Sequence, residues 1–249
     1  SRKQKINIKA IIMKTKQFTG KILLIVAFSL IFWACNDENE TSNFEAFADA
    51  YVLKKEIDGE VKYAATFFVY GNKAISSATV TPPAGVGGSF ELAATEESVY
   101  SFYKEPREDD FTSELPLEGN YLFEVVSASD ESLEKSDLLE NGSLSIPTIT
   151  DFTYQPASES ADVKWESVAN ADGYVVRLLD TGGKVIFLSY SLSAGADELS
   201  ISPVTGNWAE QAYSGENYTL QLQAFSYEPG ITDEELLAYN VKEISITET

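Results

Sequence analysis

Short runs in which apolar and polar residues alternate constrain the fold of this chain more than any other feature. In residues 218–224, four apolar side chains alternate with Thr219, Gln221 and Gln223. Such alternation places the apolar side chains on one face of a strand. Similar runs recur, separated by Gly, Pro, Asn and Asp, which mark turns. The chain is therefore predicted to be all-β, built as β-sandwiches.

Two stretches of the C-terminal half carry a more specific pattern, WESVANADGYVVRL (165–178) and SGENYTLQLQAFS (214–226). They resemble the second and third strands, and the corner before the sixth strand, of a fibronectin type III domain. The resemblance covers about 147–249. It implies structural roles for Trp165 and Tyr174 in the core, and for Tyr218, whose hydroxyl would bond to upstream backbone. The sequence departs from the family at two positions near the corner, Ala212 and Ser214, where the family usually has Leu and Pro.

The N-terminal half repeats the corner pattern around Tyr121, which lies 97 residues before Tyr218. This spacing is about the length of one immunoglobulin-like domain, roughly 100 residues. The sequence therefore predicts an immunoglobulin-like domain over 45–146, with Tyr121 in a structural role, and a fibronectin type III-like domain over 147–249. If the two are consecutive domains, damage to the second core is expected to change the first one little.

Turn signals give the local expectations. Asp58-Gly59 predicts a hairpin between strands at 48–55 and 61–70. The Pro- and Gly-rich residues 82–88 predict a loop. The charged residues 131–140 predict a short helical turn or a loop, and the boundary between the domains is placed near 141–150.

The N-terminus contains seven basic residues and no acidic one over 1–34, with an apolar run at 22–33 that ends at Ala34-Cys35. This arrangement resembles a bacterial lipoprotein signal peptide, which is cut before a Cys that receives lipid. The resemblance implies a start at Met13, lipidation (palmitate or a similar acyl chain) of Cys35, membrane attachment through that lipid, and a flexible acidic tether over 35–44. The location implied is the outer membrane of a Gram-negative cell, on the surface or the periplasmic face. The alternative is a plain membrane anchor with an incidental Cys.

Charge and composition argue against several functions. Without residues 1–34 the chain keeps 11 basic and 39 acidic residues, a net charge of −28. Such a surface repels phosphate backbones, so no nucleic-acid partner is expected. The chain has no His, and its one Cys would carry lipid. We therefore predict no catalytic residues, no metal site and no cofactor, and a protein that is not an enzyme.

The candidate ligand-binding residues are Trp208 and Tyr213, because aromatic rings in loops can stack on sugars. The alternative for Trp208 is packing over the end of the sandwich. The aromatic run 100–103 alternates and is expected to be strand core. The acidic groups at 96–97, 105–110 and 233–235 are expected to be solvated, although paired carboxylates can serve glycoside hydrolysis or calcium binding.

The function expected from the sequence is binding by a non-enzymatic, membrane-anchored surface or periplasmic lipoprotein. Its partner would be an outer-membrane protein or an extracellular ligand. The alternative is an accessory glycan-binding lipoprotein of a polysaccharide-uptake system. A carboxylate-dependent hydrolase is a third reading. Because one fold serves many functions, the fold does not choose between them.

Overall fold

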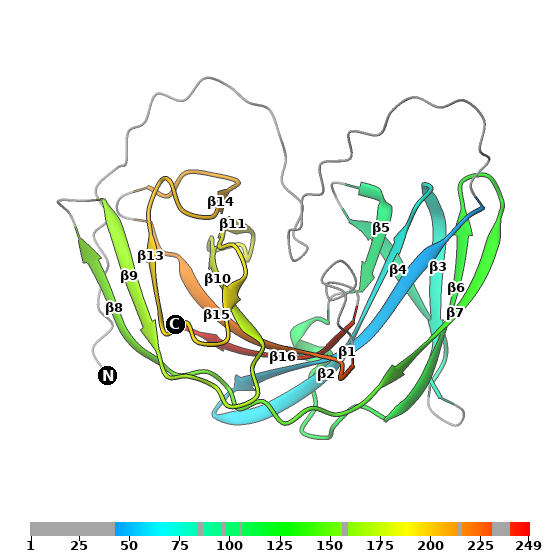
Figure 1. Ribbon diagram of the computed structural model, residues 1–249, viewed down its shortest axis with the longest axis horizontal. Helices are drawn as coiled ribbons and strands as arrows, with labels where there is room; N and C mark the ends of the chain where they lie inside the picture. The colour runs from blue at the N-terminus through cyan, green and yellow to red at the C-terminus, as the bar shows by residue number, and fades with distance from the viewer. Residues whose placement is uncertain are drawn as a thin grey trace.

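The computed structural model describes residues 43–83, 87–95, 98–104, 106–155, 159–213, 216–230 and 240–249. The fold is all-β, which confirms the predicted fold class (Figure 1). The strands of the first half are β1 (Ala46–Ile57), β2 (Glu60–Gly71), β3 (Ile75–Thr81), β4 (Phe90–Thr95), β5 (Ser98–Lys104), β6 (Gly119–Ser127) and β7 (Ser132–Leu139). Those of the second half are β8 (Ile149–Gln155), β9 (Ser160–Trp165), β10 (Gly173–Leu179), β11 (Val185–Leu188), β12 (Leu192–Ser193), β13 (Glu198–Ile201), β14 (Asn207–Trp208), β15 (Thr219–Tyr227) and β16 (Val241–Glu248).

The two halves repeat one pairing order. In the first half, β1, β2 and β5 form one side, while β4, β3, β6 and β7 form the other. In the second half, β8, β9 and β13 form one side, while β11, β10, β15 and β16 form the other. When the two-residue strands β12 and β14 are left out, each half has seven strands. In both halves, the first, second and fifth strands form one side. The other side pairs the fourth, third, sixth and seventh strands in that order. In the first half β4 also pairs with β5, which links the two sides.

Each half encloses its own apolar core. In the first, the ring of Phe67 lies 5.3 Å from that of Tyr121 and 6.2 Å from that of Phe123, measured between centroids. In the second, the rings of Trp165 and Tyr174 lie 5.5 Å apart. Where alternate residues of a strand point into these cores, the sequence pattern of period two marks the strand correctly, as at 48–55, 61–70, 100–103, 174–178 and 218–224.

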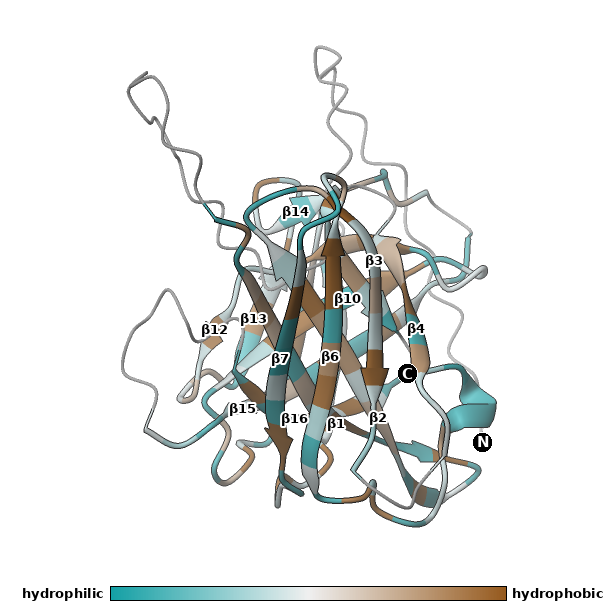
Figure 2. Cartoon of the chain, turned by 90° about the vertical axis from the view of Figure 1, so that its right-hand side faces the viewer, coloured by the Kyte–Doolittle hydropathy of each residue, from teal (hydrophilic) through white to brown (hydrophobic). Residues whose placement is uncertain are grey.

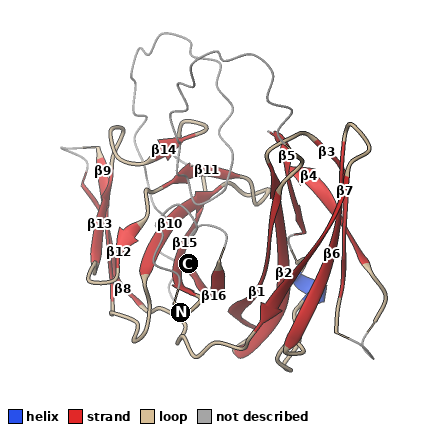
Figure 3. Ribbon diagram, turned by 45° about the vertical axis from the view of Figure 1, so that its right-hand side comes forward, coloured by secondary structure: helices blue, strands red, loops and turns tan. Residues whose placement is uncertain are grey.

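A parallel pairing joins one sheet of the second half to the first half, whereas β8, β9 and β13 form a separate three-stranded sheet. Strand β16, the last of the chain, pairs with β1, the first, from Val52–Glu243 to Lys55–Ile246. The two halves diverge from a base made by β1, β2, β15 and β16, and form the arms of a V (Figures 1 and 3). A third apolar cluster spans the base, with Tyr51, Leu53 and Phe68 from the first half and Val241 and Ile246 from the second.

The local predictions have mixed outcomes. The Asp58-Gly59 hairpin is present, and both residues have positive φ, 55° and 80°, as a type I′ turn requires. The described ends of the 82–88 segment lie between β3 and β4 and form no strand. The prediction of a helical turn or loop at 131–140 is wrong, because Ser132–Leu139 forms strand β7, paired along its length with β6. Figure 2 shows teal, hydrophilic segments along β7 beside β6.

Candidate functional site at the junction of the two halves

The residues predicted to be structural lie in or beside the cores. Trp165 is 3% exposed and Tyr174 is fully buried. The Tyr174 hydroxyl accepts a hydrogen bond from the Val168 N–H at 2.7 Å. The loop between β9 and β10 is therefore fastened to the aromatic pair at the centre of the second core.

Both corner tyrosines bond to upstream backbone. The Tyr121 hydroxyl donates to the carbonyl of Leu117 at 3.0 Å, and its ring is buried. The Tyr218 hydroxyl accepts from the N–H of Tyr213 at 2.8 Å, and its ring is half-buried. Tyr121 lies in β6 and Tyr218 directly precedes β15, so each marks the start of the sixth strand of its half.

The two candidate ligand-binding aromatics differ in their surroundings. Trp208 lies in β14, with its ring 4.8 Å from that of Phe187, and its Nε1–H donates to the carbonyl of Ser202 at 3.0 Å. This geometry is that of a ring packed against the second core. Tyr213 is 57% exposed and offers its ring to solvent. The structure does not bring the two rings together in any contact among the described residues.

The structure describes only part of the remaining predicted groups. Residues 100–103 lie in β5, where Phe102 is buried in the first core and Tyr100 is exposed. Glu108–Asp110 form a 3₁₀ turn in which Glu108 and Asp109 are exposed and Asp110 is half-buried. Cys35 and the acidic residues at 96–97, 105 and 233–235 lie outside the described residues. Among the described residues, no group of three or more His, Cys, Asp or Glu side chains is placed to hold a metal ion.

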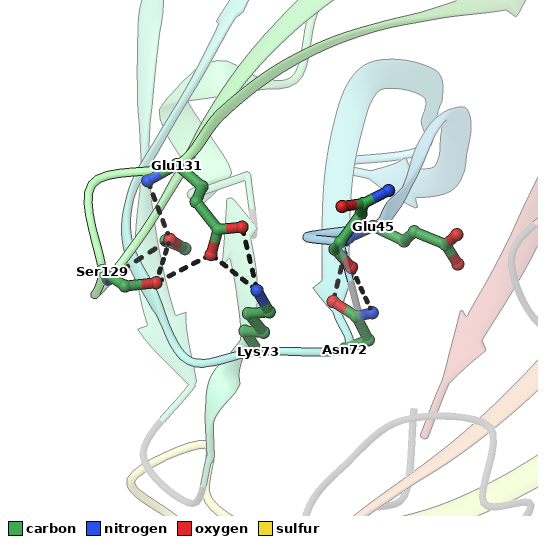
Figure 4. Close-up of polar contacts among 7 residues, drawn as sticks. Glu45, Asn72, Lys73, Ser129 and Glu131 are labelled. Atoms are coloured by element: carbon green, nitrogen blue, oxygen red, sulfur yellow. Dashed lines mark hydrogen bonds and ion pairs between the residues drawn. The ribbon is translucent and has the colours of Figure 1, made fainter. Parts of the chain in front are cut away.

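The first described residues are fastened to the tip of the first arm. The Asn72 side chain accepts from the Glu45 N–H at 2.9 Å and donates to the Asn43 carbonyl at 3.0 Å (Figure 4). Next to it, the Lys73 ammonium pairs with both oxygens of Glu131, at 2.9 and 2.7 Å. The chain therefore enters β1 at a fixed point, between the β2–β3 and β6–β7 turns.

A densely bonded group of polar side chains lies where the two halves meet, and sequence reasoning did not find it. On one side, Glu243 of β16 accepts from the Leu144 N–H at 2.8 Å, while the ammonium of Lys54 in β1 donates to the Leu144 carbonyl. Lys54 and Glu243 are themselves 3.8 Å apart. A Cβ added at Gly142 would collide with the Glu243 carboxylate. The connection between the halves is thus clamped by one side chain from each.

On the edge of β1, two carboxylates replace strand-to-strand hydrogen bonds. Asp137 of β7 accepts from the Ala50 N–H at 2.7 Å. Asp49 accepts from the Val241 N–H at 3.0 Å through Oδ2. These bonds lie just beyond the stretch of β1 that pairs with β16. Strand β1 is therefore held by β7 over its first part and by β16 over its second.

Burial disturbs the titration of these acids. Burial, and after it the charge of Asp137, raises the pKa of Asp49 well above its ordinary value. Burial also raises the pKa of Asp137 and of Glu243. The pKa of Glu228, just after β15, is raised to about 7 by burial and by the charges of Asp137 and Glu140. The nearby Lys242 ammonium pairs with Glu140 at 3.1 Å.

A pocket of about 230 Å³ opens beside this junction. Its wall includes Ser143 of the connection, Asp172, Tyr227 and Lys242. The Asp172 carboxylate accepts from the Tyr227 N–H at 2.8 Å, which fixes the end of β15 to the turn before β10. The junction therefore combines buried acids with a pocket whose wall carries polar groups.

One sequence signal could have pointed to the junction. Asp49 is the single charged residue in the apolar run Ala46–Leu53. Every other residue of this run except Phe47 is buried or half-buried. A lone acid in such a run is costly unless it bonds to something specific. The bonding partner, Val241, lies 192 residues away, which no local pattern can indicate.

Comparisons with known proteins identify no family. No family model matches the chain, and no curated protein matches it. Three solved structures of a β-glucuronidase from Ruminococcus gnavus are similar, in complex with D-glucuronic acid, uronic deoxynojirimycin and D-glucaro 1,5-lactone. Identities are 15%, 14% and 15%, TM-scores are 0.26, 0.25 and 0.25, and each match covers 74% of this chain. The chain spans about a third of the enzyme's length, 36%, 35% and 35%.

This finding corrects one sequence-based prediction. The chain was predicted not to be an enzyme, and the solved structures that it matches are enzymes. The prediction that the chain is not an enzyme is therefore withdrawn. With TM-scores of 0.26 and below, the match does not show an enzymatic activity for this chain either.

Among the described residues, no helix has the length and apolar character needed to cross a membrane.

Proposed function

We propose that this chain is a lipid-anchored binding protein of the Gram-negative cell envelope, attached through Cys35 at the outer membrane. The observation that carries the proposal is the basic and apolar segment that ends at Ala34-Cys35 and is followed by a strongly acidic chain. The fastening of Asn43 and Glu45 by Asn72 supports it, because a short tether would then end at a fixed point of the first arm. The partner would be a protein or an extracellular ligand.

The proposal includes the type of the two halves, immunoglobulin-like for the first and fibronectin type III-like for the second. Their common pairing order and the two corner tyrosines support this assignment. In such proteins binding surfaces are formed by loops and exposed faces, and affinity depends on a few residues rather than on the fold.

The anchoring is tested by replacing Cys35 with Ser in the full chain, expressed in a Gram-negative host. We expect the variant to lose incorporation of a palmitate analogue and to leave the membrane fraction, because the thiol is the point of attachment. Ala34→Gly, which keeps a small residue before the Cys, is the matched control and should still be labelled. Labelling of the Cys35→Ser protein would overturn the proposal.

The alternative, an accessory glycan-binding lipoprotein of a polysaccharide-uptake system, is favoured by one observation, the exposed ring of Tyr213. A glycan array probed with the Cys35→Ser protein tests it. Binding that Tyr213→Ala reduces and Tyr213→Phe retains would support the glycan function. No binding to any glycan would leave a protein partner as the proposal.

A further inference from the structure

Four carboxylates and one ammonium group gather beside the middle of β1, and they come from different parts of the chain. Asp49 belongs to β1, Asp137 to β7, and Lys242 to β16, while Glu140 and Glu228 lie directly after β7 and β15. The charges of Asp137 and Glu228 raise the pKa of Asp49. The charges of Asp137 and Glu140 raise the pKa of Glu228, and the charge of Lys242 lowers it. Negative charge therefore exceeds positive charge in the joint between the two arms.

Asp49 is the least solvated member of this group. Its side chain is 1% exposed, and among the described residues its Oδ1 has no hydrogen-bond partner. A buried carboxylate oxygen without a partner is costly when it carries charge, and much less costly when the acid is protonated. The other oxygen, Oδ2, holds the first N–H of β16. Asp49 therefore has one buried oxygen whose charge is costly and is removed by protonation. Its other oxygen makes the hydrogen bond that links β1 to β16.

We propose that this group is a proton-operated clamp: when it holds protons, β7 and β16 are both fastened to β1, and when it loses them, the first residues of β16 loosen from β1. The clamp acts across the bonds that Asp49 accepts from the Val241 N–H and Asp137 accepts from the Ala50 N–H. Burial raises the pKa of both acids by more than these two bonds lower it, so the buried arrangement favours the protonated acids. Lys242 compensates one negative charge through its pair with Glu140. The hydroxyl of Tyr51, on the same face of β1, is a further titratable neighbour of Asp49, and Tyr103 of β5 and Arg177 of β10 act in turn on Tyr51.

The direction of the pH effect follows from the raised pKa values. An acid whose pKa is higher in the folded chain than in the unfolded chain binds its proton more tightly when folded. Its favourable contribution is complete below the unfolded pKa and is lost as the pH rises toward the folded pKa. For Glu228 this window runs from about 4.5 to about 7. The clamp should therefore be tightest in mildly acidic solution and weaken toward pH 8.

The test uses the full chain with Cys35→Ser, and follows amide hydrogen exchange at Val241 and Ala50 between pH 5 and pH 8. After correction for intrinsic exchange, we expect protection at Val241 to fall about tenfold over this range, a change of the size that one pK unit of coupling produces. Asp49→Asn keeps an acceptor for Val241 and cannot ionise, so the pH dependence of protection at Val241 should be smaller than in the parent protein. The part that remains comes from Glu228 and Asp137, which still titrate. Glu228→Gln should weaken the dependence.

The matched control is Glu134→Gln, on β7 but exposed, which removes a carboxylate outside the group. Its pH dependence should equal that of the parent protein. Protection at Val241 that does not change with pH in the parent protein would overturn the proposal. So would an unchanged dependence in both Asp49→Asn and Glu228→Gln. If Asp49→Asn does not fold, the Glu228→Gln result decides.

Discussion

At the scale of single residues, the two exposed-loop candidates, Trp208 and Tyr213, turn out to have different physical tasks. Their sequence contexts look alike, since both follow turn-rich stretches. Only the structure shows that the indole of Trp208 meets Phe187 and bonds to the Ser202 carbonyl, while the Tyr213 ring stays in solvent. A sequence can therefore name the aromatic residues that are free to bind, but it cannot say which of them packing has already used.

This difference predicts the behaviour of two variants. Trp208→Ala removes a half-buried ring and an indole hydrogen bond, so it should lower the free energy of unfolding by about 2–4 kcal/mol. Tyr213→Ala should change it by less than about 0.5 kcal/mol, as for most exposed positions, because only its backbone N–H bonds to Tyr218. Urea denaturation of both proteins measures this. Equal effects of the two substitutions would contradict the packing described for Trp208.

At the scale of elements, strand β7 shows why one part of the fold could not be predicted. Its positions paired with the buried Tyr121, Phe123 and Val125 hold Asp137, Lys135 and Leu133. Two charged residues on this face break the apolar alternation, so the segment has the pattern of a loop. Asp137 occupies its place because it accepts the Ala50 N–H. Asp137 thus bonds β7 to β1, and its charge is also one reason why the sequence pattern does not indicate a strand here.

By contrast, the strands at 174–178 and 218–224 follow from their alternation alone, since every inward position there is apolar. The parallel pairing of β1 with β16 could not be predicted in the same way. Alternation fixes which face of a strand is buried, but it does not identify a partner strand some 190 residues away. The candidate site lies at that pairing and was missed together with it.

The connection between the halves gives a prediction at the same scale. Glu243→Ala should lower the free energy of unfolding by about 2–4 kcal/mol, because the Leu144 N–H loses its acceptor and Lys54 loses its ion-pair partner. Segment 142–144 should also become sensitive to proteases. Glu248→Gln, on the exposed end of the same strand, keeps an acceptor for the Gln221 side chain and is the control. A protein as stable and as resistant as the parent would show that the clamp contributes nothing.

At the scale of the whole molecule, the continuous sheet changes what a lesion in one half does to the other. Trp165→Ala removes a buried aromatic ring, a change that usually costs about 3–5 kcal/mol. Consecutive independent domains would confine the loss to the second half. The base cluster of Tyr51, Leu53, Phe68, Val241 and Ile246 needs both halves in place. We therefore expect the variant to lower the melting temperature of the first half as well.

Differential scanning calorimetry measures this, combined with hydrogen exchange at residues 52–55 and in β6. The parent protein should unfold in one transition, and in Trp165→Ala that transition should move as a whole. Two separate transitions, with only the second shifted, would contradict the coupling and favour independent domains.

The fastening of the first described residues also has a mechanical consequence. In a protein held by its N-terminus, tension from the tether passes through Asn43 and Glu45 into β1. This strand is bonded to β2 along Ala46–Ile57 and to β16 over residues 52–55. A pull along the strand axis loads the hydrogen bonds of both ladders at the same time, in shear, whereas a pull across the axis would break them one after another. In a protein held in this way, the strand that connects the two arms would thus also be the first strand to bear the load.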